Sequence, residues 1–248
     1  MVAPALNDPL LVVHALDAGH GGTDALADLG FTLDRGEWMA VVGANGSGKS
    51  TLLDVVGGRL APRRGHVCIA GHDLAGDAPA ARHALGYAIA GEAMPPLLTG
   101  RQCIAVHAAA RGIEAGGADV ADLVEAFGIG RWLDDPVALM SYGTRQKFGV
   151  VLAFVGAPPL LVLDESFNGL DPASSLVLQR RLRAHAKDNG GAVLLATHAL
   201  DLVERCADRA LMLHEGRLVR LWSRAAIAAG QAAEGGFEAV MAQALATG

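Results

Sequence analysis

The chain of 248 residues has few cysteines and no excess of positive charge. Its three cysteines, Cys68, Cys103 and Cys206, are scattered and form no C-x-x-C spacing, so neither a disulfide framework nor a zinc site is expected. The formal net charge is −6 and the sequence pI is about 5.8. Because nucleic-acid binders usually carry basic surfaces, this acidic balance argues against a nucleic-acid partner.

The chain also lacks an uninterrupted apolar run long enough to span a membrane. Its longest apolar stretch, 148–163, contains Pro158 and Pro159, which predict a helix that ends before a buried strand. Residues 1–9 have neither the basic start nor the apolar core of a secretory signal. Together with the scattered thiols, this predicts a protein that stays in the cytoplasm.

Apolar strands alternate with helical segments along the chain, a pattern typical of an α/β protein with a mostly parallel sheet. The predicted strands are Leu10–His14, Glu37–Val42, Val67–Ala70, Leu85–Ile89, Leu160–Leu163, Ala192–Ala196, Ala210–His214 and Leu218–Trp222. The predicted helices are Lys49–Gly57, Gly100–Arg111, Asp119–Phe127, Thr144–Val155, Ala173–Lys187, Leu200–Arg205 and Phe237–Leu245.

Two segments stand out from this alternation. The segment from about 91 to 155 is nearly all helical, which predicts a helical subdomain inserted in the α/β core. The alanine-rich end, 225–248, is broken by glycines and is expected to form short surface helices. The sequence shows no internal repeat, so residues 1–248 are expected to form a single catalytic domain.

The most informative segment is a glycine-rich loop that follows the apolar residues Trp38 to Val42. It reads Gly43-Ala44-Asn45-Gly46-Ser47-Gly48-Lys49-Ser50-Thr51 and fits the pattern G-x-x-x-x-G-K-[ST]. Its glycines allow backbone N–H groups to surround a polyphosphate, and the helix that begins at Lys49 directs its positive end to the same anion. Lys49 is predicted to lie between the terminal phosphates, and the Ser50 hydroxyl to bind Mg²⁺.

A second catalytic element lies far downstream, where the buried-type strand Leu160–Leu163 is followed by Asp164 and Glu165. Strand ends are where α/β proteins collect their ligands. Asp164 is predicted to hold Mg²⁺ through water, and Glu165 to polarise a water for attack on the γ-phosphate. Because adjacent residues on a strand point to opposite faces, the two carboxylates are expected to point in different directions.

The sequence between and after these elements resembles that of ATP-binding cassette (ABC) proteins. The run Met140-Ser141-Tyr142-Gly143-Thr144-Arg145-Gln146-Lys147 is similar to the signature loop, whose usual form is L-S-G-G-Q. Asn168-Gly169-Leu170-Asp171 is similar to the family's D-loop, and Ala196-Thr197-His198 to its switch histidine. The resemblance runs from Leu10 to Met241 and implies a RecA-like, mostly parallel sheet with antiparallel N-terminal strands and an inserted helical subdomain.

The resemblance also implies a head-to-tail dimer that holds ATP between the phosphate loop of one copy and the signature loop of the other. Ser141, Tyr142, Gly143 and Thr144 would then face the γ-phosphate across the interface, where a hydroxyl and helix-start N–H groups suit an anion. Asp171 would cross the dimer seam and help to shape the opposite site. Two identical copies, or this chain and a related cassette, are both compatible with the sequence.

Two histidines are assigned by the resemblance. His198 lies at a strand end and matches the histidine that contacts the γ-phosphate. His20 falls where the family usually has an aromatic ring that stacks on adenine, and an imidazole can stack over a smaller area. An exposed loop histidine beside Gly19, Gly21 and Gly22 is the alternative for His20.

The chain departs from the family pattern at Ala90, where a glutamine normally binds Mg²⁺ and senses the γ-phosphate. Alanine can do neither, so water is expected to complete the shell of the metal. Ser166 follows Glu165 where proline is common, which changes the stiffness of the loop rather than its chemistry.

These features together predict an ATPase subunit of an ABC transporter that uses ATP and Mg²⁺ and lies on the inner face of the cell membrane. The resemblance favours export through separate transmembrane subunits, with a partner helix in a groove near 90–111 that offers Leu97, Leu98 and Ile104. A soluble ABC ATPase that acts on ribosomes or DNA is one alternative. A regulatory, weakly hydrolysing cassette, which Ala90 makes conceivable, is another.

Overall fold

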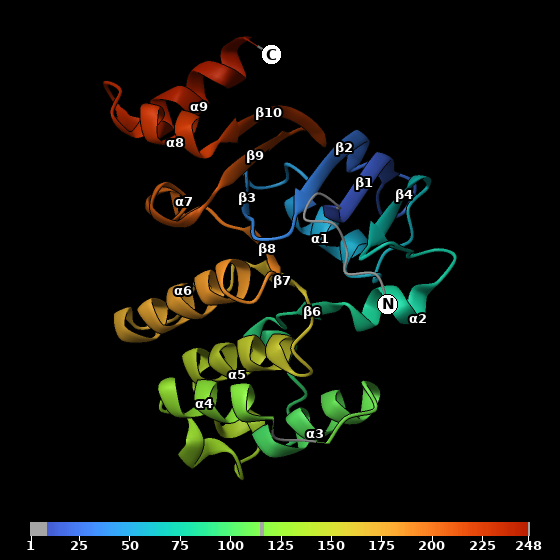
Figure 1. The fold of residues 1–248 in the computed structure, drawn as a ribbon, viewed down its shortest axis with the longest axis vertical. Helices are drawn as coiled ribbons and strands as arrows, with labels where there is room; N and C mark the ends of the chain where they lie inside the picture. Colours follow the sequence, from blue (N-terminus) through green and yellow to red (C-terminus); the bar gives the residue numbers. More distant parts are fainter. Residues whose placement is uncertain (1–8, 115–116, 248) are drawn as a thin grey trace.

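The computed structural model describes residues 9–114 and 117–247 of the chain. The prediction about a secretory signal rests almost entirely on residues 1–8, outside these ranges. Two sheets form the centre of the molecule, and helices cover them (Figure 1). No helix among the described residues is long and apolar enough to cross a membrane.

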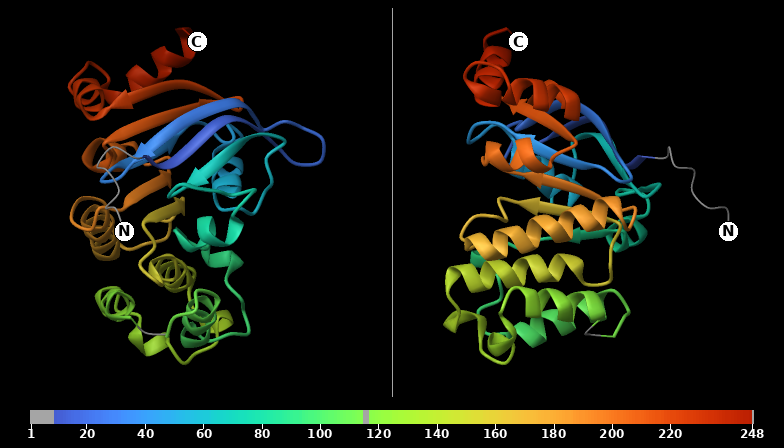
Figure 2. Two further views of the ribbon diagram at one scale, coloured as in Figure 1. Left: turned by 45° about the vertical axis from the view of Figure 1, so that its right-hand side comes forward. Right: turned by 60° about the vertical axis from the view of Figure 1, so that its left-hand side comes forward.

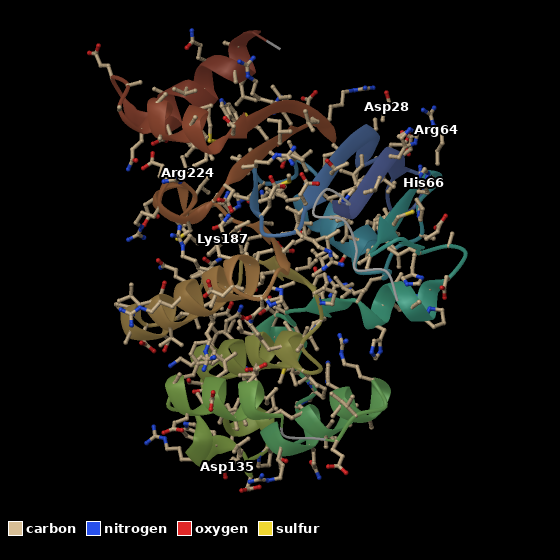
Figure 3. All side chains as sticks on the ribbon, in the orientation of Figure 1. Asp28, Arg64, His66, Asp135, Lys187 and Arg224 are labelled. Atoms are coloured by element: carbon tan, nitrogen blue, oxygen red, sulfur yellow. The ribbon has the colours of Figure 1, made fainter. Side chains whose placement is uncertain are left out.

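The first sheet is antiparallel and has four strands in the order β2-β1-β4-β5. These strands are β1 (Pro9–Ala18), β2 (Leu26–Asp34), β4 (Arg64–Ile69) and β5 (His72–Asp73). In β1 the alternate residues Leu11 and Val13 are buried. At the outer margin of the sheet Asp28 and Arg64 form an ion pair of 3.2 Å (Figure 3). Because burial alternates along the strand, one face of the sheet packs on the core and the other faces solvent.

The second sheet has six strands in the order β10-β9-β3-β8-β7-β6, and its five strands from β9 to β6 are parallel. The strands are β3 (Trp38–Val42), β6 (Leu85–Tyr87), β7 (Leu160–Asp164), β8 (Ala192–Ala196), β9 (Arg209–His214) and β10 (Arg217–Ser223). Residues of β7 alternate between two cores, with Val162 in one and Leu161 in the other. Burial on both faces explains why this strand reads as a continuous apolar run.

The helices divide between the two faces of this sheet. Helix α1 (Lys49–Val56) packs between the sheets, where it contacts β1 of the first sheet and β7 and β8 of the second, with Leu52 and Leu53 fully buried. Helices α5 (Tyr142–Phe154) and α6 (Pro172–Lys187) cover the other face, while α7 (Leu200–Cys206) lies beyond them along the sheet. The short α2 (Ala78–His83) covers the β6 edge.

The segment expected to be helical, 91–155, contains α3 (Gly100–Ala110), α4 (Ala118–Ala126) and α5, with short turns of 3₁₀-helix at Gly91–Ala93, Gly130–Trp132 and Val137–Leu139. Thr99 and Gln102 form a capping box that begins α3. This helical group and the C-terminal helices lie at opposite ends of the molecule (Figure 2).

Helices α8 (Arg224–Gln231) and α9 (Gly236–Thr247) form the C-terminal end, as short helices like those predicted. They are not only surface helices, because Phe237 and Ile227 are fully buried. The Phe237 ring meets Trp222 of β10 edge to face, with ring centroids 5.2 Å apart. The pair therefore fastens the end of the chain to the sheet.

Replacing Phe237 by alanine should remove this anchor. We expect Phe237→Ala to lower the free energy of unfolding by about 3–5 kcal/mol, as for other large buried aromatic residues. Leu245→Ala, at a position on α9 that is 40% exposed, is the matched control and should change it by under about 1 kcal/mol. Chemical denaturation measures both, and equal losses would contradict the role of Phe237.

Candidate functional site

The glycine-rich loop joins the end of β3 to the start of α1, as the sequence predicted. Gly48 caps α1 in a left-handed conformation, with φ of 105°. A Cβ atom there would lie 2.7 Å from the backbone oxygen of Ala25 and would clash. The loop is held from the other side by the β9–β10 turn, because Gly216 donates its N–H to the Ser47 carbonyl at 3.0 Å. Gly216 also accepts from the N–H of Ala27 in β2 at 2.9 Å.

Lys49 is buried and turns back onto its own loop. Its Nζ donates to the carbonyls of Gly43 at 2.8 Å and Ala44 at 3.1 Å. Burial lowers the pKa of Lys49, while the nearby carboxylates of Glu165 and Asp164 act in the opposite direction. A single cation thus lies among two carbonyls and two carboxylates.

Asp164 and Glu165 line the same cavity, so the expectation that they point in different directions is wrong. The reason lies in the backbone, because β7 ends at Asp164 and Glu165 adopts a left-handed φ of 45°. This conformation is uncommon for a residue with a side chain. The Glu165 N–H remains bonded to the Ala196 carbonyl of β8 at 3.0 Å.

His198 follows β8 and reaches the same place from the neighbouring strand. Its Nε2 lies 3.2 Å from Glu165 Oε1. Burial raises the pKa of Glu165, and the nearby His198 and Lys49 partly offset that rise. The pair places an acid–base group beside the phosphate loop.

These elements enclose a cavity of about 340 Å³. Its lining residues are Ala25, Asn45, Gly46, Gly48, Lys49, Ser50, Thr51, Asp164, Glu165 and His198. Gly43 and Ser47 are parts of the loop behind the cavity and do not line it. The structure therefore brings together most of the predicted phosphate-binding, metal-binding and catalytic side chains.

Two oxygen groups in the cavity suit a hard cation. Asp164 Oδ1 is buried and has no hydrogen-bond partner among the described residues, and the Ser50 side chain lines the same space. Mg²⁺ takes oxygen ligands and is usually held by one or two protein groups together with phosphate oxygens and water. Within the described ranges, no cluster of three or more His, Cys, Asp or Glu residues forms an all-protein metal cage.

Several predicted residues lie outside this cavity. His20 is exposed in the loop between β1 and β2. Ser141 caps α5, where its Oγ accepts from the Thr144 N–H at 3.2 Å, so this helix begins at Tyr142 rather than at Thr144. Tyr142, Gly143 and Thr144 occupy the first turn of α5 and do not line the cavity of their own chain.

Asp171 caps α6 and pairs with α5 of its own chain, the helix that begins in the segment resembling the signature loop and is called the signature helix below. Its Oδ1 accepts from the Ser174 N–H at 2.9 Å, and its Oδ2 lies 2.7 Å from Lys147 Nζ. These bonds, the one from Lys147 first, hold the pKa of Asp171 well below its usual range. Lys147 was not predicted as a site residue, although it lies in the segment that resembles the signature loop.

Ala90 is extended and precedes the short helix at Gly91–Ala93. The next N–H, of Gly91, donates to Oε1 of the buried Gln146 in α5 at 2.9 Å. Gln146 was also missed, because its partner lies 55 residues away in the sequence. The backbone after β6 is thereby fixed to the helix that carries the signature loop.

Comparison with known proteins identifies the family. The model of the ABC transporter family matches residues 26–168, more than half of the chain. The chain belongs to the ATP-binding subunits of ABC transporters. The α/β fold with an inserted helical group, predicted from the sequence, is confirmed by this match and by solved structures.

This ABC cassette is similar to proteins from distant sources. It is 32% identical to the uncharacterized ABC transporter ATP-binding protein YdbJ of Bacillus subtilis, over 86% of the chain and 69% of that protein. It is 31% identical to the human phospholipid-transporting ATPase ABCA7, over 88% of the chain but only 10% of that longer protein. A solved ATP-binding subunit of an ABC transporter superimposes with a TM-score of 0.85 at 32% identity, over 95% of this chain and 99% of that one.

Replacing Lys49 by alanine should weaken binding of MgATP to the cassette about 10- to 100-fold, because charge-assisted hydrogen bonds to phosphate are lost. Equilibrium binding of a fluorescent ATP analogue measures the change. Lys187→Ala is the control, since Lys187 lies at the end of α6 (Figure 3) and does not line the cavity. Unchanged binding by Lys49→Ala would contradict the site.

Proposed function

We propose that this cassette hydrolyses ATP to ADP and phosphate and thereby powers a transporter. The supporting observation is the single cavity that gathers Lys49, Ser50, Asp164, Glu165 and His198 at one sheet edge. The triphosphate would lie along the glycine-rich loop and at the N-terminus of α1, where backbone N–H groups are available. Asn45, Gly46, Gly48 and Thr51 line that part of the cavity.

In this mechanism Lys49 exchanges its bonds to the Gly43 and Ala44 carbonyls for bonds to β- and γ-phosphate oxygens. Ser50 and Asp164 would hold Mg²⁺, which supplies charge stabilisation when it is bound. The remaining ligands would be phosphate oxygens and water, because Ala90 has no side-chain amide.

Glu165 orients and deprotonates the attacking water in the proposed reaction. Its pKa is raised by burial, which makes the carboxylate a stronger base than an exposed glutamate. His198 lies 3.2 Å from it and would steady the transferred phosphoryl group. The His198–Glu165 contact would loosen as His198 turns to the γ-phosphate.

The active form proposed is a head-to-tail dimer, with an identical copy or a related cassette. Ser141, Tyr142, Gly143 and Thr144 of the second copy would complete the site, since in one chain they lie outside the cavity. The N-terminus of the 13-residue α5 presents N–H groups suited to the γ-phosphate. The loop that carries Asp171 would lie along the seam.

The partners proposed are separate transmembrane subunits, which would hold the cassette at the inner face of the membrane and export a substrate. Of the three predicted contact residues only Leu97 is free, at 87% exposure, because Leu98 and Ile104 pack into the helical group. Leu139, in the short 3₁₀-helix Val137–Leu139, is 69% exposed. The Ala138 N–H beside it donates to the carbonyl of Pro96, the residue before Leu97, so the two segments are joined. Two exposed leucines on segments that are bonded to each other suit a protein partner better than a nucleic acid.

One observation favours a second candidate, a regulatory cassette or one not coupled to transport. Ala90 removes the side chain that normally senses the γ-phosphate, so nucleotide state would reach a partner only through the backbone held by Gln146. Steady ATP turnover by the purified protein separates the two, since a sensor should show almost none.

Replacing Glu165 by glutamine tests the chemistry. Glu165→Gln should lower turnover at least about 100-fold, because the base is lost, and leave MgATP binding within about threefold. A phosphate-release assay measures turnover, and gel filtration with MgATP should show a persistent dimer. Asp134→Asn, which removes an exposed carboxylate paired with Arg101, is the control. Undiminished hydrolysis by Glu165→Gln would remove Glu165 from its role.

Replacing Leu97 and Leu139 by aspartate tests the partner surface. The double variant should retain basal ATP turnover within about twofold yet bind the membrane subunits about tenfold or more weakly, because it buries charge in an apolar contact. Leu245→Asp is the control, because Leu245 is also an exposed leucine but lies on α9 at the other end of the molecule (Figure 1). Copurification with coexpressed transmembrane subunits measures the loss, and equal retention by all variants would contradict the surface.

A further inference from the structure

The signature helix and the loop after the catalytic glutamate are braced together within one chain. The brace is the ion pair between Lys147 of α5 and Asp171, the residue that caps α6, at 2.7 Å. Lys147 also donates to the Phe127 carbonyl at 3.4 Å, and its side chain is only 15% exposed. Exposed ion pairs contribute little to stability, but this lysine is fixed by two partners and by burial.

A backbone contact supports the same brace independently. A Cβ atom on Gly143 would lie 2.7 Å from the Gly169 carbonyl oxygen, so the first turn of α5 packs directly on the loop of Asp171. Gly169 has a left-handed φ of 76°, and a Cβ atom there would lie 2.4 Å from the Tyr142 ring. Glycine at both positions permits this close approach.

The braced loop begins at the catalytic group. Asn168 donates its backbone N–H to the Glu165 carbonyl at 2.9 Å, and its side-chain amide lies 3.4 Å from Glu165 Oε2. Three residues later Asp171 holds Lys147. The Lys147–Asp171 ion pair and the close approach of Gly143 to Gly169 thus fix the position of Ser141, at the start of α5, relative to Glu165 of the same chain.

We propose that Lys147 is a positioning residue that acts through Asp171 to set the signature loop of its own chain for the nucleotide bound by the other copy. The proposal rests on the shared-site dimer of the proposed function. In this arrangement the Asp171 carboxylate holds Lys147 of its own chain. Lys147 touches no nucleotide, and its effect falls on the site that its signature loop completes.

Mixed dimers in which only one nucleotide site can work test this assignment. One copy carries Lys49→Ala, which disables its phosphate loop and keeps its signature loop. The other carries Ser141→Arg, which disables its signature loop and keeps its phosphate loop. The two copies are purified together through different affinity tags, and Lys147→Met is added to one copy or to the other.

Lys147→Met in the Lys49→Ala copy should lower turnover at saturating MgATP about tenfold, since that copy supplies the working signature loop. The ATP concentration for half-maximal rate should change by less than about threefold. The same substitution in the Ser141→Arg copy should leave turnover within about twofold. Lys147→Arg, which keeps the charge, should restore most of the rate in the first arrangement.

The outcomes separate positioning from stability. Equal losses in both arrangements would show a general structural effect and overturn the proposal, as would no loss in either. No turnover in the parental Lys49→Ala and Ser141→Arg pair, with an active wild type, would overturn the shared-site dimer itself. Asp171→Asn, whose amide oxygen can still cap α6, should reproduce the asymmetry of Lys147→Met.

Discussion

Burial of β7 and β8 on both faces is the constraint on which the site depends. Alternate residues of these strands enter different cores, which excludes charged groups from all but the strand ends. Polar chemistry therefore begins where the strands end, at Asp164, the last residue of β7, at Glu165 next to it, and at His198 after β8. Because the strands are parallel and β3 lies beside them, these ends open at the edge where the phosphate loop begins.

Lys49 is the centre of the electrostatics of the cavity. Lys49 is bonded to two carbonyls of its own loop and lies near the carboxylates of Asp164 and Glu165. Asp164 keeps a buried oxygen without a hydrogen-bond partner in the described part of the chain. The cavity thus offers a buried carboxylate oxygen that suits a metal ion and an ammonium group that suits phosphate oxygens.

The parts of this architecture that depend on local spacing could be predicted from the sequence. The phosphate loop, β7 and β8 lie where the motif and the apolar runs put them. Strand β2 was missed because Asp28, with a left-handed φ of 51°, shifts its alternation of apolar residues between Leu26 and Leu29. The orientation of Glu165 was wrong for a similar reason, since a single backbone angle decides it and no pattern of residue types records that angle.

Contacts between distant residues were beyond prediction. Gln146 meets Gly91 across 55 residues, and Lys147 meets Asp171 across 24. The spacing of His20 before Lys49 left two readings open, a ring stacked on adenine and an exposed loop histidine. The structure shows an exposed His20 that does not line the cavity, and its contact with adenine stays a prediction. Spacing along the chain fixes a loop's ends but not the direction of its side chains.

The turn at Gly216 links regions that are far apart in the sequence. It bonds to Ser47 of the phosphate loop and to Ala27 of β2, and its hairpin leads through β10 to the helices anchored by Phe237. These contacts therefore join the phosphate loop to α8 and α9 through the β9–β10 hairpin, by a path that does not pass through the helical group. One hairpin of the sheet thus connects the C-terminal helices to the loop that begins α1.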